Sequence, residues 1–165
     1  MSERLYTVKD VAAIIAPEPS MRERVLRQVR HWTATDVLKP LGGKATGTGV
    51  SRVYKADDVR KAALVLEIVR YGVPLDVLES FSEWCDGLIK DGTWEDAIEG
   101  RRDVFMAIML EHGDDPGVIW GVERGVAKLP LISLSKTWKQ EELRIAEPAS
   151  AIAVNLSKVF KRLNL

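Results

Sequence analysis

Hydrophobic residues recur every three to four positions through the first 90 residues, which is the spacing of amphipathic helices. A capping-box pattern over residues 7–10 predicts a short helix that Pro17 ends. A second such pattern, over residues 20–23, predicts a helix that runs to about Trp32. These two helices are therefore joined by a tight connection that contains prolines, an arrangement typical of helix-turn-helix motifs.

Two more helices follow after a glycine-rich segment, residues 41–51. Residues 37–39 and 52–54 read as short paired strands on either side of that segment, which together form a hairpin with a long tip. No Gly-Lys-Ser/Thr stands in the tip, so a nucleotide-binding loop is not expected. A third helix is predicted from Asp57 or Asp58, with Gly72 just beyond its end, and Pro74 opens a fourth.

The second half of the chain mixes strand and helix patterns. Strands are predicted over residues 104–110, 118–122, 131–134 and 151–156, and helices over residues 93–99, over residues 137–145 and after Ser157. Glycines such as Gly87 and Gly92 interrupt residues 83–116, so no long helix is expected there. The fold class is therefore α+β, with a helix-turn-helix-type domain over 1–82 and a small α+β module over 83–165, for which dimerisation or effector binding is the expected role.

Composition places these elements in a globular protein of 165 residues. Hydrophobic residues make up 46% and charged residues 29%, which argues against disorder. A single cysteine, Cys85, excludes a disulfide framework and fits a reducing compartment. With no apolar run of 18 residues and no leader pattern, a cytoplasmic protein without membrane contact is expected.

The net charge is zero, but the charges are unevenly spread. Residues 1–56 hold ten Lys/Arg and five Asp/Glu, a net charge of +5. Residues 57–123 hold six and sixteen, a net charge of −10, and residues 124–165 hold eight and three, a net charge of +5. A basic first third can be a nucleic-acid footprint or a chance clustering of charge.

The polar face of the second helix carries the strongest candidate chemistry. Its residues are hydrogen-bond donors that suit phosphate oxygens and the edges of guanine and adenine. They are Arg24, Arg27, Gln28, Arg30 and His31, and Arg22 is a further candidate that lies on the apolar side of the wheel but in the first turn. The alternative is a solvated amphipathic helix with no partner.

Four segments in order resemble the DNA-binding domain of MerR-family transcriptional regulators. They are Tyr6-Thr7-Val8-Lys9-Asp10-Val11-Ala12, Val29-Arg30-His31-Trp32 with Leu38-Lys39-Pro40, Arg52-Val53-Tyr54-Lys55-Ala56-Asp57-Asp58-Val59, and Tyr71-Gly72-Val73-Pro74-Leu75. The resemblance covers residues 5–82 and implies a winged helix-turn-helix. Helix 20–32 would then read the major groove, and a wing with Lys44, Arg52 and Tyr54 would contact flanking DNA. The family's long coiled-coil helix is not evident here.

The second half offers no catalytic constellation, so neither an enzyme nor a cofactor is expected. A metal cluster at His112, Asp114 and Asp115 competes with a solvated hairpin tip, and we favour the tip. Trp94, Trp120 and Trp138 are either core residues or the walls of an effector pocket for a small molecule or a protein segment. Cys85 is expected in the core rather than as a sensor thiol.

The function expected from these observations is a sequence-specific transcriptional regulator that binds double-stranded DNA. A single winged domain contacts little DNA, so a homodimer is expected. Two alternatives remain open. One is an architectural DNA-binding protein of the excisionase or phage-packaging type, and the other is a protein–protein interaction module.

Overall fold

The computed structural model describes residues 4–42, 51–73, 75–101, 104–110, 118–123, 131–133, 150–163 and 165. The chain divides into a first unit of residues 1–66 and 159–165 and a second unit of residues 67–158. The expected boundary lay after residue 82. The division observed here falls inside the third helix, and it assigns the C-terminal residues 159–165 to the first unit. The fold class is α+β, as expected.

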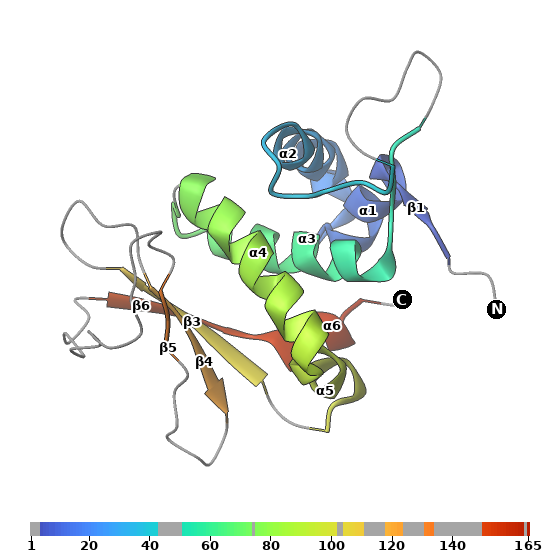
Figure 1. Ribbon diagram of the computed structural model, residues 1–165. Helices are drawn as coiled ribbons and strands as arrows, with labels where there is room; N and C mark the ends of the chain where they lie inside the picture. Colours follow the sequence, from blue (N-terminus) through green and yellow to red (C-terminus); the bar gives the residue numbers. More distant parts are fainter. Residues whose placement is uncertain are drawn as a thin grey trace. The chain divides into compact units, whose positions relative to one another are not determined.

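The first unit is built around two packed helices. Its elements are β1 (Tyr6–Thr7), α1 (Val8–Ile15), the 3-10 turn η1 (Pro19–Met21), α2 (Arg22–Ala34), β2 (Val53–Tyr54) and most of α3 (Ala56–Val69). Helices α1 and α2 lie against each other (Figure 1). The side chains that they bury are Val11, Ala12, Ile15, Val25, Leu26, Val29, Trp32 and Thr33. Their apolar spacing in the sequence thus corresponds to one shared core.

The first capping box forms as predicted. The Thr7 hydroxyl accepts a hydrogen bond from the Asp10 backbone N–H at 3.3 Å, and Asp10 Oδ2 accepts from the Thr7 backbone N–H at 2.8 Å. Asp10 Oδ2 also accepts from the Thr7 hydroxyl at 2.7 Å. These bonds favour the carboxylate and lower the pKa of Asp10 below its ordinary value.

The second predicted capping box, over residues 20–23, does not form. Helix α2 has Met21 as its N-cap and no side-chain capping bond. The preceding residues form the turn η1 with Pro19 at its start, and the Ser20 hydroxyl donates to the Glu18 carboxylate at 3.3 Å instead. The prediction was wrong because proline begins a turn before the expected cap position.

The strands of the first unit pair differently from the predicted hairpin. β2 pairs antiparallel with β1, with Tyr6 opposite Tyr54 and Thr7 opposite Val53. Residues 37–39 form no strand, and contact with the returning chain is a single bridge in which the Leu41 N–H donates to the Val53 carbonyl at 2.8 Å. This bridge still brings the two ends of the glycine-rich segment together.

A buried hydrogen bond joins α2 to β2. The Tyr54 and Thr33 hydroxyls lie 2.7 Å apart, and the Thr33 hydroxyl also donates to the Val29 carbonyl at 2.8 Å. Both side chains are fully buried. Burial raises the pKa of Tyr54 despite the bond to Thr33. Because the single Thr33 hydroxyl hydrogen is donated to the Val29 carbonyl, the Tyr54 hydroxyl is the donor to Thr33.

The second unit begins with the end of α3 and continues with two helices. These are α4 (Leu75–Asp91) and α5 (Thr93–Glu99), which contact each other. Gly87 does not break α4, contrary to the prediction, because it is exposed while Trp84 and Leu88 hold the buried face. Gly92 ends the helix, since its φ of +82° turns the chain into the left-handed region, and it is also the N-cap of α5.

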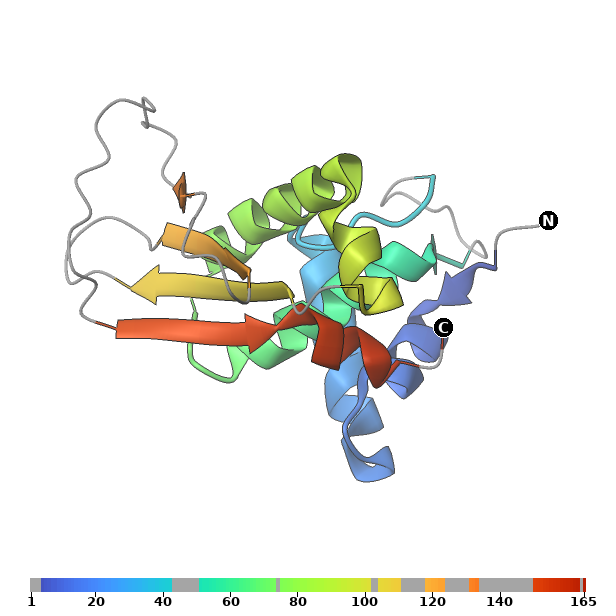
Figure 2. The same cartoon turned by 90° about the horizontal axis from the view of Figure 1, so that it is seen from below.

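A four-stranded antiparallel sheet completes the second unit. Its strands are β3 (Val104–Leu110), β4 (Val118–Glu123), β5 (Leu131–Ser133) and β6 (Ser150–Asn155), in the order β5-β4-β3-β6. Figure 2 shows β4, β3 and β6 side by side. All four predicted strands are confirmed with small shifts at their ends. The helix predicted over 137–145 lies outside the described residues.

The last helix, α6 (Leu156–Lys161), begins just before Ser157, the residue after which it was predicted. The Asn155 side-chain carbonyl accepts from the Lys158 N–H at 2.9 Å. The Ser157 hydroxyl accepts from the Val104 N–H at 3.1 Å, a bond to β3 rather than a helix cap. Ser157 therefore links the start of β3 to the residues just after β6, at one end of the sheet, and Asn155 caps the helix.

The two capping-box patterns provide a matched pair of stability tests. Thr7→Ala removes the hydroxyl that bonds the Asp10 N–H, and we expect the free energy of unfolding to fall by about 1 kcal/mol. Ser20→Ala removes no capping bond, so we expect a change within about 0.5 kcal/mol. Urea denaturation of both variants measures these values. Equal losses would mean that Ser20 caps α2 after all.

The Thr33–Tyr54 bond should respond unequally to loss of either partner. Thr33→Val leaves the buried Tyr54 hydroxyl without this bond, which should cost about 1–3 kcal/mol of unfolding free energy. Tyr54→Phe leaves the Thr33 bond to Val29 intact and should cost about 0.5–1.5 kcal/mol. The double variant should be more stable than Thr33→Val alone. Strictly additive losses by chemical denaturation would show that the two hydroxyls are not coupled.

Candidate nucleic-acid interface

The candidate interface is the outward face of α2. Burial of Val25, Val29 and Trp32 places one side of the helix in the core and turns the polar side outward. Five of the six predicted residues on this helix are exposed: Arg22, Arg24, Arg27, Arg30 and His31. Gln28 is half-buried at the border of the face. The structure therefore gathers Arg24, Arg27, Arg30 and His31 on one surface, whereas Arg22, in the first turn, lies on the side of Val29 at 100° per residue.

The four arginines of α2 make no ion pair with any residue that the structure describes. The arginines at positions 60, 70 and 101 differ, because each lies within 3.2 Å of a neighbouring carboxylate. Glu23 is the one acidic residue within α2. The outward face therefore presents guanidinium groups whose hydrogen-bond donors are open to an anionic partner.

Helix geometry orders these residues across the face. At 100° per residue, Arg24, Arg27 and His31 lie opposite the buried Val29, and Arg30 lies to one side of them. A helix of 13 residues is about 20 Å long. The major groove of B-DNA is about 12 Å wide and admits a helix of this diameter. Arg24, Arg27 and His31 are thus the residues that would project furthest into a groove.

The remaining predicted residues are not all on this surface. Tyr54 does not belong to a binding face, because its side chain is fully buried and its hydroxyl lies 2.7 Å from that of Thr33. We therefore remove Tyr54 from the DNA-binding set. Arg52, two residues before it, is half-buried. Lys44 lies outside the described residues.

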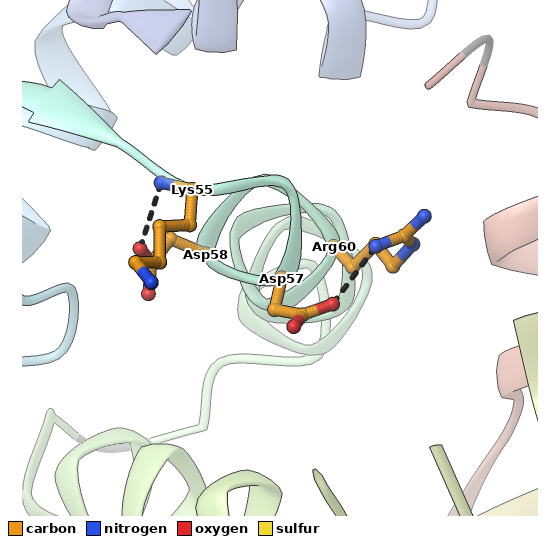
Figure 3. Close-up of polar contacts among 4 residues, drawn as sticks. All are labelled: Lys55, Asp57, Asp58 and Arg60. Atoms are coloured by element: carbon orange, nitrogen blue, oxygen red, sulfur yellow. Dashed lines mark hydrogen bonds and ion pairs between the residues drawn. The ribbon is translucent and has the colours of Figure 1, made fainter. Parts of the chain in front are cut away.

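The residues that follow Tyr54 stabilise the start of α3 (Figure 3). Asp58 Oδ2 accepts from the Lys55 backbone N–H at 3.0 Å, as the second half of a capping box does. Asp57 Oδ1 pairs with the Arg60 guanidinium at 2.8 Å, one turn along the helix. These bonds explain why acidic residues stand in the first turn of α3, where they also complement the helix dipole. This part of the MerR-like signature has a local structural role.

Exposed basic residues of the first unit that were not among the predicted contacts include Arg4, Lys9 and Lys39. The guanidinium of Arg4 lies 5.1 Å from the centre of the Tyr6 ring. Lys39 follows the end of α2. Each of the three stands apart from other basic residues in the sequence, so no local pattern identifies it as a binding residue. Only the net charge of the first unit, to which all three contribute, indicates them.

The division into units sharpens the separation of charge. The first unit holds fourteen Lys/Arg and seven Asp/Glu, a net charge of +7, and the second holds ten and seventeen, a net charge of −7. α2 therefore belongs to a strongly basic body, and the strand-rich unit is equally acidic. A polyanion is attracted to the first unit and repelled by the second.

The described residues of the second unit add no site to this picture. Trp94 and Cys85 are fully buried, in line with the core interpretation, and the side chains of Trp120 and Trp138 lie outside the described part. No three described His, Cys, Asp or Glu side chains form a metal-binding group, and His112, Asp114 and Asp115 fall outside the description. None of the helices that are described is long and apolar enough to cross a membrane.

The candidate interface is supported by its own residues and not by similarity to known proteins. These are the arginines and the imidazole of α2, on a basic unit, with no acidic partner among the described residues. No family model matches the sequence, and no match is found among curated proteins.

Proposed function

We propose that this protein is a sequence-specific DNA-binding transcriptional regulator with a MerR-like winged helix-turn-helix in its first half. In this proposal α2 enters the major groove. Arg24, Arg27 and His31 reach furthest in, Arg30 contacts a phosphate beside them, and Arg22 contacts a phosphate from the first turn of the helix. Gln28 borders the face and can bond an adenine edge.

The observation that carries the proposal is the unpaired basic face of α2. Four exposed arginines on one 13-residue helix repel one another, and none of them forms an ion pair with a described carboxylate. Helix stability does not explain them, since Arg22 and Arg24 stand in the first turn, where the helix dipole disfavours positive charge. A duplex supplies the compensating charge and suits the guanidinium fork.

Two further observations support the same function. The Leu41–Val53 bridge closes the glycine-rich segment at its base, and a wing of the proposed kind needs such a closure. That segment carries Lys44, and Arg52 lies at its end. The +7 charge of the first unit against −7 on the second favours approach of DNA to the unit that carries α2.

An architectural DNA-binding protein is the second candidate, and one observation favours it. α4 is 17 residues long and ends at Gly92, so the described chain holds no helix of the length that a MerR-type antiparallel coiled coil requires. Promoter activation that depends on such a coiled coil is therefore not part of the proposal. The two candidates differ in the DNA sites that they select.

Selection of genomic fragments by the purified protein at physiological salt tests the proposal. A small set of sites that share an inverted repeat supports a dimeric regulator. A single or tandem motif, together with DNA bending, supports the architectural candidate. Enrichment no greater than with a protein-free control contradicts both, and would direct attention to a protein partner of the acidic unit.

Substitution of Arg27 separates base reading from phosphate contact. Arg27→Ala should weaken binding to a selected site by about 1–3 kcal/mol and relax the preference at one base position, because this side chain lies at the centre of the outward face. Titration against the selected site and its single-base variants measures both effects.

The matched control is Arg70→Ala. Arg70 is also an exposed arginine near a helix end, but it pairs with Glu67 at 3.2 Å and lies in the acidic unit, so its loss should leave DNA affinity unchanged. Uniform weakening of Arg27→Ala on every sequence would make Arg27 a phosphate contact. Equal losses in the two variants would remove α2 from the interface.

A further inference from the structure

The sheet of the second unit has one long outer edge. The strand order β5-β4-β3-β6 makes β6 the last strand, and all six of its residues pair with β3, from Ser150 opposite Leu110 to Asn155 opposite Phe105. No other described strand pairs with β6. The backbone N–H and C=O groups of alternate residues therefore point away from β3 along about 20 Å of edge.

Within Ser150–Asn155 this edge carries none of the sequence features that prevent strand pairing between molecules. Exposed edges are usually short or carry charged residues, prolines or bulges. The opposite edge, β5, is only three residues long. β6 has the sequence Ser-Ala-Ile-Ala-Val-Asn, with no charge and no proline, inside a unit that carries 27 charged residues among 92. A neutral six-residue edge in so charged a unit is suited to pairing.

We propose that β6 pairs antiparallel with β6 of a second copy of this chain, which joins two four-stranded sheets into one of eight strands. An antiparallel pair of identical strands has two-fold symmetry, so each copy presents the same surface and the assembly closes at two. The absence of charge on β6 means that the two strands meet without like-charge repulsion. This proposal does not depend on DNA binding, although a dimer would supply two copies of α2.

Backbone geometry restricts the register of the pairing. The outward groups on β6 belong to every second residue, and two residues that exchange hydrogen bonds must both come from that set. A two-fold axis therefore passes beside a residue and not between two residues. Axes at Ile152 or Ala153 pair five residues of each strand, more than any other choice within Ser150–Asn155.

Hydrogen exchange on the unmodified full chain tests the proposal together with sedimentation equilibrium. We expect the mass to rise with concentration toward twice the 18.4 kDa of one chain. Every β6 amide should then exchange slowly, and dilution to the monomer should expose alternate β6 amides only. The control is β3, which has strands on both sides and should stay protected throughout.

The outcomes that overturn the proposal are distinct. A chain that stays monomeric at all concentrations rules out the dimer. Alternate β6 amides that exchange rapidly even in a dimer place the interface elsewhere. Alternate amides that stay slow in the monomer show that the chain itself covers this edge. Failure of DNA binding changes none of these readings, because no DNA is present.

Single-cysteine variants test the axis directly. A residue beside a two-fold axis lies about 4.5–5.5 Å from its own counterpart between Cα atoms, within the range of a disulfide. Either Ile152→Cys or Ala153→Cys should therefore form a covalent dimer on mild oxidation. Ser150→Cys should not, since its counterpart would lie more than about 10 Å away. The wild-type chain is a second control, because Cys85 is buried. Equal cross-linking of all three variants contradicts the assigned axis. A lack of cross-linking in both Ile152→Cys and Ala153→Cys contradicts it as well.

Discussion

The burial of one side of α2 is the constraint on which the candidate interface depends. Val29 is fully buried and Trp32 nearly so, against a core shared with α1, and this fixes the rotation of the helix about its axis. Once the rotation is fixed, the side chains of Arg24, Arg27 and Arg30 face outward. The Thr33–Tyr54 bond then ties the same helix to β2, so that the base of the glycine-rich segment and the basic face belong to one rigid arrangement.

Charge divides the molecule along the same line as its packing. The basic unit contains α1, α2 and the β1–β2 pair. The acidic unit contains α4, α5 and the four-stranded sheet. A neutral chain with two oppositely charged bodies can attract a polyanion to one body while the other remains solvated. Net charge alone conceals this property, since the two contributions cancel.

Particular residues show why some sequence patterns were reliable and others were not. The patterns at residues 7–10 and 20–23 are alike, yet only the first forms a capping box, because Pro19 starts a 3-10 turn before the second. Gly87 was expected to break a helix that buried neighbours instead maintain. Tyr54 was expected at a DNA surface, since a tyrosine beside Arg52 suits either role, and only the packing shows that it is buried.

The sequence by itself determined the helices, the four strands of the sheet and the composition of the outward face of α2. Their apolar periodicity follows from residues near one another along the chain, so it is visible before folding. The tertiary structure decided which strand pairs with β2, where the units divide and which strand forms the outer edge of the sheet. Those features depend on contacts between residues far apart in sequence, such as Tyr6 with Tyr54 and Leu110 with Ser150, which no local pattern encodes.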